Sequence, residues 1–152
     1  MARKRQSSAS TYDRALKLAQ REKTPSRKTY DLLLRADQEG DTRATYALAT
    51  WYLFGSPFTK VNYRQGAALL RRAAAGKIAE AAYNLAISYE KGLGVKKSAA
   101  RAFELYVQAA LLGEAQAYCE VGRMYYWGIG VPRNRRLADH WLAKAESLGI
   151  TE

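Results

Sequence analysis

Apolar residues recur along most of this chain at intervals of three and four positions, which is the spacing of one face of an α-helix. The clearest stretch is residues 79–112, where two such stripes follow each other. They consist of Ala81, Leu85 and Tyr89 and, after a short segment that contains two glycines, of Ala102, Leu105, Tyr106 and Ala109. The pattern predicts two amphipathic helices that bury these stripes against each other.

The same stretch returns 36 residues later. The matched positions are Leu85/Val121, Ala86/Gly122, Tyr89/Tyr125, Gly92/Gly128, Gly94/Gly130, Ala102/Ala138, Leu105/Trp141 and Ala109/Ala145. An earlier copy stands 36 or 37 residues before it, with one extra residue in the loop at 56–65. A period between about 20 and 50 residues indicates an array of stacked units, none of which can bury its apolar face alone.

Each full repeat predicts two antiparallel helices. The first helices are expected at residues 42–54, 79–91 and 115–127, and the second helices at 63–75, 98–112 and 134–148. Before them, Thr24 as an N-cap and Pro25 in the first turn predict a helix from Pro25 to Glu39, which Gly40 ends. Apolar residues between Tyr12 and Ala19 predict one more helix, from Thr11 to about Glu22.

We therefore predict an all-α fold, an α-solenoid of antiparallel helix pairs. A single domain spans residues 11–152 and contains an N-terminal helix, a half repeat at 24–41 and full repeats at 42–78, 79–114 and 115–150. Residues 1–10 are basic and then rich in serine, so we expect a disordered basic arm. They contain no apolar segment, which argues against a secretory signal.

The glycine pairs between the helices are expected to form structural turns. Gly92 and Gly94, like their counterparts in the next repeat, follow the end of a helix, where glycine adopts a positive φ at little cost. The segment ends in Lys97-Ser98 and so is superficially similar to a phosphate-binding loop. However, Lys96 stands where such a loop needs its last glycine, and a helix rather than a strand precedes it. The first repeat lacks this glycine pattern, so its loop should differ.

The formal charge of +11 raises the question of nucleic-acid binding. Residues 1–28 hold nine Lys or Arg side chains against Asp13 and Glu22, a net charge of +7, whereas the remaining residues have a net charge of +4. The charge is therefore concentrated near the beginning of the chain. A solvated arm explains it, and contact with phosphates or an acidic partner is the alternative.

Candidate catalytic chemistry is sparse. His140 is the only histidine and is expected on a solvent-facing stripe, and Cys119 has no histidine or cysteine at metal-ligand spacing. We therefore expect no enzyme activity, no cofactor and no metal. A single cysteine cannot form an intrachain disulfide, so a reducing compartment, the cytoplasm, is expected. No run of about 18 apolar residues occurs, and no membrane span is expected.

The segment that begins at Ala79 has the pattern Ala-x-Ala-x-x-Asn-Leu-Ala-x-x-Tyr-x-x-Gly-x-Gly-Val and is followed by the stripe from Ala102 to Ala109. This pattern resembles Sel1-like repeats, relatives of the tetratricopeptide repeats with a slightly longer unit. The resemblance covers about 110 residues from Thr42 onward. It implies a helical solenoid used for adaptor and scaffold contacts. Secreted members often carry a disulfide within a repeat, which this chain cannot form, and this too favours the cytoplasm.

The resemblance also implies a binding surface, because the first helix of each tetratricopeptide repeat lines a concave groove. Transferred by register, the expected partner-binding positions are Tyr46, Thr50, Phe54, Tyr83, Ile87, Lys91, Arg123, Tyr126 and Trp127. Exposed aromatic and apolar side chains that lie next to each other mark contact sites. The alternative is that some of them pack against the neighbouring repeat or the N-terminal helix.

Two classes of function follow. The first is a non-catalytic module that binds a peptide or protein in this groove, either as an adaptor or as an immunity or antitoxin-like protein that blocks a toxin. The second is binding of nucleic acid or an acidic partner by the basic arm, together with Arg71, Arg72, Arg133, Arg135 and Arg136. The sequence favours the first class and does not identify the partner.

Overall fold

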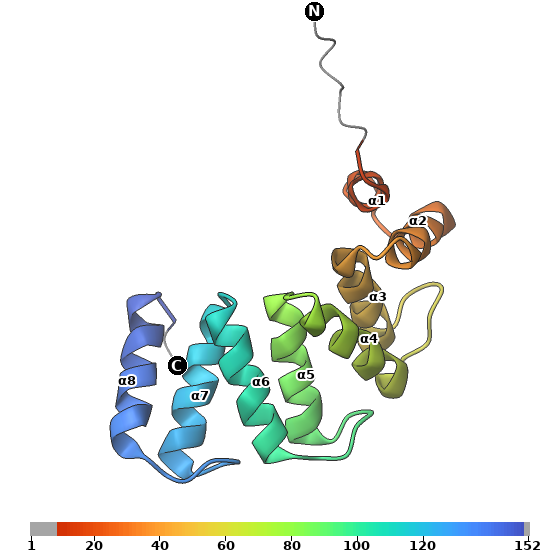
Figure 1. Ribbon diagram of the computed structural model, residues 1–152. Helices are drawn as coiled ribbons and strands as arrows, with labels where there is room; N and C mark the ends of the chain where they lie inside the picture. Colours follow the sequence, from red (N-terminus) through yellow and green to blue (C-terminus); the bar gives the residue numbers. More distant parts are fainter. Residues whose placement is uncertain (1–8, 151–152) are drawn as a thin grey trace, which may run out of the picture.

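The computed structural model describes residues 9–150, which form eight α-helices and no strand. The helices are α1 (Thr11–Ala19), α2 (Arg27–Gln38), α3 (Thr42–Phe54), α4 (Tyr63–Ala75), α5 (Ala79–Lys91), α6 (Ala99–Leu111), α7 (Ala115–Trp127) and α8 (Arg135–Ser147). Consecutive helices stand side by side in one row from α1 to α8 (Figure 1). The all-α solenoid is confirmed. Residues 1–8 of the expected arm lie outside the described residues.

The helix boundaries follow from local capping. α3, α4, α5 and α7 begin and end at the predicted residues, and α6 and α8 begin one residue later than predicted because Ser98 and Asn134 are their N-caps. The predicted start of α2 is wrong. Ser26, not Thr24, caps this helix by accepting a hydrogen bond from the Thr29 N–H. Glu22 lies outside α1 and accepts hydrogen bonds from Ser26 and Thr29, which explains why α1 ends early.

One backbone hydrogen bond closes each helix pair. The N–H of the N-cap residue of the second helix donates to the carbonyl of a tyrosine in the first. The pairs are Asn62 to Tyr52 at 2.8 Å, Ser98 to Tyr89 at 2.9 Å and Asn134 to Tyr125 at 2.9 Å. The first loop differs in between, as expected, because Ser56 and Thr59 form an isolated antiparallel bridge there. This local structure takes up the extra residue of the loop, and the closing hydrogen bond stays the same.

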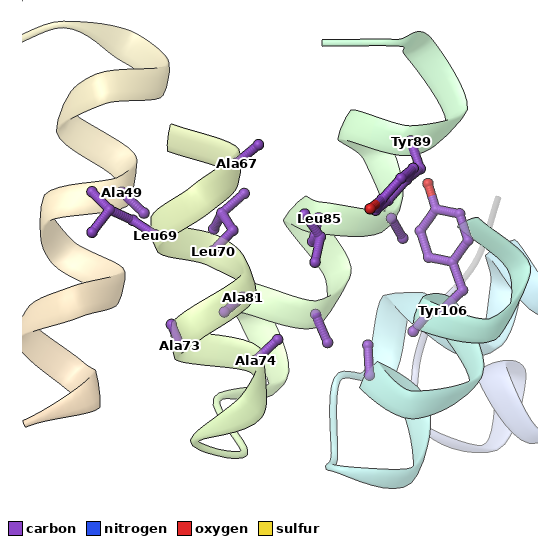
Figure 2. Packing of buried hydrophobic residues seen from close by; sticks show 14 of the residues in the cluster. Ala49, Ala67, Leu69, Leu70, Ala73, Ala74, Ala81, Leu85, Tyr89 and Tyr106 are labelled. Carbon is purple, nitrogen blue, oxygen red and sulfur yellow. The ribbon is translucent and has the colours of Figure 1, made fainter. Parts of the chain in front are cut away.

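The core alternates large and small side chains between the helices. Leu70 and Tyr106 are almost completely buried, and the alanines around them have essentially no exposed surface. In Figure 2, Leu69 points from α4 toward α3, where Ala49 lies. A Cβ atom on Gly122 would lie 2.7 Å from the Leu142 side chain, so glycine there lets α7 and α8 approach closely. Alternation of this kind sets the spacing between stacked helices.

The N-terminal helices extend this stack. On α2, Tyr30 stacks on Trp51 of α3 and on Phe58 of the first loop, with ring centroids 5.5 Å apart in both pairs. Arg43 of α3 reaches α1, where its guanidinium lies 3.2 Å from Asp13. The half repeat and the first helix are therefore packed onto the first full repeat.

Candidate functional site

Four of the nine predicted side chains line one groove between α5 and α7. Tyr83, Ile87 and Lys91 recur every four residues along α5 and so share a stripe, and Arg123 faces them from α7. The groove has a volume of about 730 Å³. The other residues that line it are Glu90, Lys97, Ala99, Tyr106, Glu120 and Ile129. We call this surface the α5–α7 groove.

A network of charged groups joins the two walls of the α5–α7 groove. The Arg123 guanidinium donates to Glu90 Oε1 on α5 and to Glu120 Oε2 on its own helix, both at 2.8 Å. The Tyr106 hydroxyl donates to the other oxygen of Glu90 at 2.9 Å. Burial alone would lower the pKa of Arg123, but the hydrogen bonds to Glu120 and Glu90 outweigh it and raise the pKa, so the guanidinium stays charged. The network fixes the polar part of the groove.

Tyr83 supplies the aromatic part of the groove. Its half-buried ring meets the ring of Tyr106 edge to face, with centroids 5.5 Å apart. Burial raises the pKa of Tyr83, and the charges of Glu120 and Glu114 raise it further. The phenol therefore stays protonated, and its hydroxyl can act as a hydrogen-bond donor beside an apolar face.

Two predicted residues on α3 are held by local hydrogen bonds. The Tyr46 hydroxyl accepts a hydrogen bond from Asn84 Nδ2 at 3.1 Å, which ties α3 to α5 next to the groove. The Thr50 hydroxyl donates to the Ala47 carbonyl at 2.7 Å within its own helix. Neither residue lines the α5–α7 groove.

The remaining predicted residues lie elsewhere, two of them exposed and Tyr126 half-buried. Phe54, at the end of α3, is 77% exposed. Trp127, at the end of α7, is 66% exposed and meets Tyr126 edge to face at 4.8 Å. The Arg135 guanidinium of α8 lies 4.0 Å from the centroid of the Tyr126 ring. Tyr126 and Trp127 thus form a second aromatic surface that the groove does not include.

Sequence reasoning missed the acidic residues of the groove, Glu90 and Glu120. A signal for both was present. Glu120 precedes Arg123 by three positions on one helix, and Glu90 follows Ile87 by three on another. Tyr106 was predicted to be buried and is, yet its hydroxyl reaches the groove.

Other chemistry is limited in the part of the chain that the structure describes. Among residues 9–150, no group of three or more His, Cys, Asp or Glu side chains is placed to hold a metal ion. His140 is exposed on α8 as predicted, and Cys119 is half-buried on α7. No helix in this part combines the length and the apolar character that crossing a bilayer requires.

Comparison with known proteins finds the same repeat. The Sel1 repeat family model matches residues 42–77, 79–114 and 115–150. Chitin synthase regulatory factor 3 of Schizosaccharomyces pombe is 36% identical over 108 residues, which are 67% of this chain and 12% of the relative. This chain therefore spans only a small part of that curated relative.

Solved structures agree with this match. A Sel1 repeat protein from Oxalobacter formigenes is 32% identical with a TM-score of 0.72, and the match covers 78% of this chain and 90% of that one. A protective antigen of uropathogenic Escherichia coli strains with an SLR fold is 27% identical with a TM-score of 0.84, and covers 92% of this chain and 30% of the antigen. The three family matches span the helix pairs α3–α4, α5–α6 and α7–α8 and more than half of the chain. This chain therefore belongs to the Sel1-repeat family.

Proposed function

We propose that this chain is a non-catalytic interaction module that holds a peptide or one face of another protein in the α5–α7 groove. Sel1-repeat proteins generally mediate contacts between proteins. One observation carries the choice of surface. The half-exposed Tyr83 and Ile87 lie directly beside the network of Arg123, Glu90 and Glu120, so apolar contact and fixed polar groups occur in one groove.

This combination is typical of an interaction hot spot. Tyrosine and arginine are over-represented among the residues that dominate binding energies, and they act best when they are rigid before the partner arrives. Here the edge-to-face contact with Tyr106 holds the Tyr83 ring, and two carboxylates hold Arg123. The groove volume of about 730 Å³ accommodates several side chains of an extended peptide or of one helix face.

Which kind of interaction protein this chain is forms a narrower proposal. The name of the fission-yeast relative describes a regulatory factor of an enzyme, and an adaptor role for this chain is in keeping with that name. An immunity or antitoxin-like role is the narrower version in which the partner is a toxin. We place the protein in the cytoplasm on the ground of its single cysteine.

Photo-crosslinking from the groove tests the proposal. A photoreactive phenylalanine analogue at Tyr83 is expected to capture a specific protein in the native cell, which mass spectrometry then identifies. The control places the same analogue at Leu111, which is 74% exposed and lies on α6 outside the groove. Equal capture from both positions, or none from Tyr83, would contradict the groove as the binding surface.

A second experiment distinguishes binding in the groove from binding by the basic arm. Removing residues 1–8 deletes Arg3, Lys4 and Arg5 and leaves every described helix in place. The shortened chain is expected to bind its partner as the full chain does, whereas the double substitution Tyr83→Ala, Ile87→Ala abolishes binding. If the shortened chain loses binding, and binding by the full chain weakens steeply with added salt as phosphate contacts do, the nucleic-acid or acidic-partner hypothesis replaces ours.

A further inference from the structure

A second, differently built site surrounds the hydroxyl of Tyr89. The phenol oxygen accepts hydrogen bonds from two arginines, Arg71 of α4 at 3.1 Å and Arg101 of α6 at 3.3 Å. Tyr89 is only 6% exposed, while both arginines are exposed. The two guanidinium groups therefore converge on one neutral oxygen at the surface. The hydrogen bond from Arg71 is also the main reason why the pKa of Tyr89 is lowered.

The positive charge at this point is not compensated. Among residues 9–150, no carboxylate lies within ion-pair distance of Arg71 or Arg101, whereas Arg72 and Arg123 both have such partners. Lys96 and Lys97 line the same cavity, which has a volume of about 580 Å³. Glu104 lines a neighbouring cavity that shares Arg71, Tyr89 and Arg101 with this one. Four cations thus share one small cavity with a tyrosine hydroxyl.

The repeat itself shows that the stack does not require these charges. Tyr125 occupies the position of Tyr89 one repeat later, and its carbonyl makes the same bond to the next helix. The residues 36 positions after Arg71 and Arg101 are Val107 and Leu137. The equivalent tyrosine is therefore held without an arginine at either position, and its ring meets that of Phe103 edge to face, with centroids 5.1 Å apart. Because like charges held close together repel each other, the arginine pair costs stability, and an anion bound between the two guanidinium groups would offset that cost.

We propose that Arg71 and Arg101, with Lys96 and Lys97, bind a phosphate monoester, carried by a phosphorylated side chain of a protein partner. Two guanidinium groups donate in parallel to tetrahedral phosphate oxygens, and arginine clusters are the usual device for recognising phosphorylated residues. The Tyr89 hydroxyl accepts from both arginines, so its own proton is available to a phosphate oxygen.

The geometry favours a single phosphate monoester over a nucleic acid. A monoester carries close to two negative charges, which suits a compact group of cations. A nucleic-acid strand carries one charge per phosphate and needs cations repeated along a track. Such a track is interrupted at the next repeat by Val107 and Leu137. The site shares only Lys97 with the α5–α7 groove, and it does not depend on what that groove binds.

Nuclear magnetic resonance of the full chain tests this proposal. The side-chain Nε–H signals of Arg71 and Arg101 are followed during titration with inorganic phosphate and with N-acetyl phosphoserine amide, at constant ionic strength. Both probes are expected to shift these signals to saturation, and N-acetyl serine amide is expected to leave them in place. The double variant Arg71→Gln, Arg101→Gln should bind at least about tenfold more weakly, because it loses the charge-assisted donors.

The control variant Arg136→Gln removes one charge from an exposed position on α8 and should bind the probes as the unchanged chain does. The amide spectrum of each variant shows whether it is folded. Shifts that grow without saturating, or equal binding by the double variant, would overturn the site. A short oligonucleotide that shifts the same signals more strongly per phosphate than phosphoserine would overturn the phosphorylated partner in favour of nucleic acid.

Discussion

The loop glycine Gly130 allows a close contact between repeats, and replacing it tests how the array is held in register. Its φ is +69°, and a Cβ atom built on it would overlap with the carbonyl oxygen of Ala99, in the first turn of α6. Gly94 stands in the same relation to Tyr63, in the first turn of α4. Each loop thus packs its backbone directly against the preceding repeat.

The cost of Gly130→Ala has two parts. A side chain at positive φ costs about 1–2 kcal/mol, and pushing a methyl group into a neighbouring backbone adds about 1–3 kcal/mol. Gly40 provides the matched control, since its φ is +87° and a Cβ atom there would have no heavy atom within 4 Å. Gly40→Ala should therefore lower the stability only by the cost of a side chain at positive φ.

Urea unfolding and thermal melting followed by circular dichroism measure both variants. If Gly130→Ala costs about 2 kcal/mol more than Gly40→Ala, its melting temperature should be about 4–8 °C lower than that of the control. The slope of the urea transition should stay unchanged for both. Equal losses of stability would mean that the loop does not rest on the preceding repeat, and the close packing of the repeats described above would be refuted.

Two further predictions concern the core and the groove network. Leu70→Ala should lower the free energy of unfolding by about 2–5 kcal/mol because the side chain is fully buried. Leu111→Ala, at a 74% exposed position, should change it by no more than about 0.5 kcal/mol. Urea unfolding measures both variants, and similar losses of stability would contradict the assigned burial. Burial, and then the hydrogen bond to Glu90, raise the pKa of Tyr106, so the unfolded chain loses the phenol proton at a lower pH than the folded chain. The free energy of unfolding therefore falls by up to about 1.4 kcal/mol per pH unit above about pH 10. In urea unfolding at increasing pH, Tyr106→Phe should remove this loss of stability at alkaline pH, and the exposed control Tyr63→Phe should not. An unchanged pH dependence of stability in Tyr106→Phe would contradict the buried, protonated phenol.

Much of the fold could be predicted because its determinants are local and repeated. Most helices here start after a residue whose side chain accepts a backbone hydrogen bond, α5 being an exception, and most end within two residues of a glycine. A register of 36 or 37 residues therefore placed four helices at their observed bounds. The start of α2 was wrong because two capping candidates, Thr24 and Ser26, lie close together there. Only the structure shows that the Glu22 carboxylate, which follows the previous helix, supports Ser26.

The binding surfaces could be predicted only in part. Register alone indicated which side chains of α5 leave the core, and Tyr83 and Ile87 do line a groove. Register could not show that Glu90 meets Arg123, 33 positions further along the chain. Nor could it show that Arg71 and Arg101 converge on the hydroxyl of Tyr89 from two other helices. Helical periodicity determines the direction in which a side chain leaves its own helix, whereas the distance between groups on different helices depends on how the helices cross and pack.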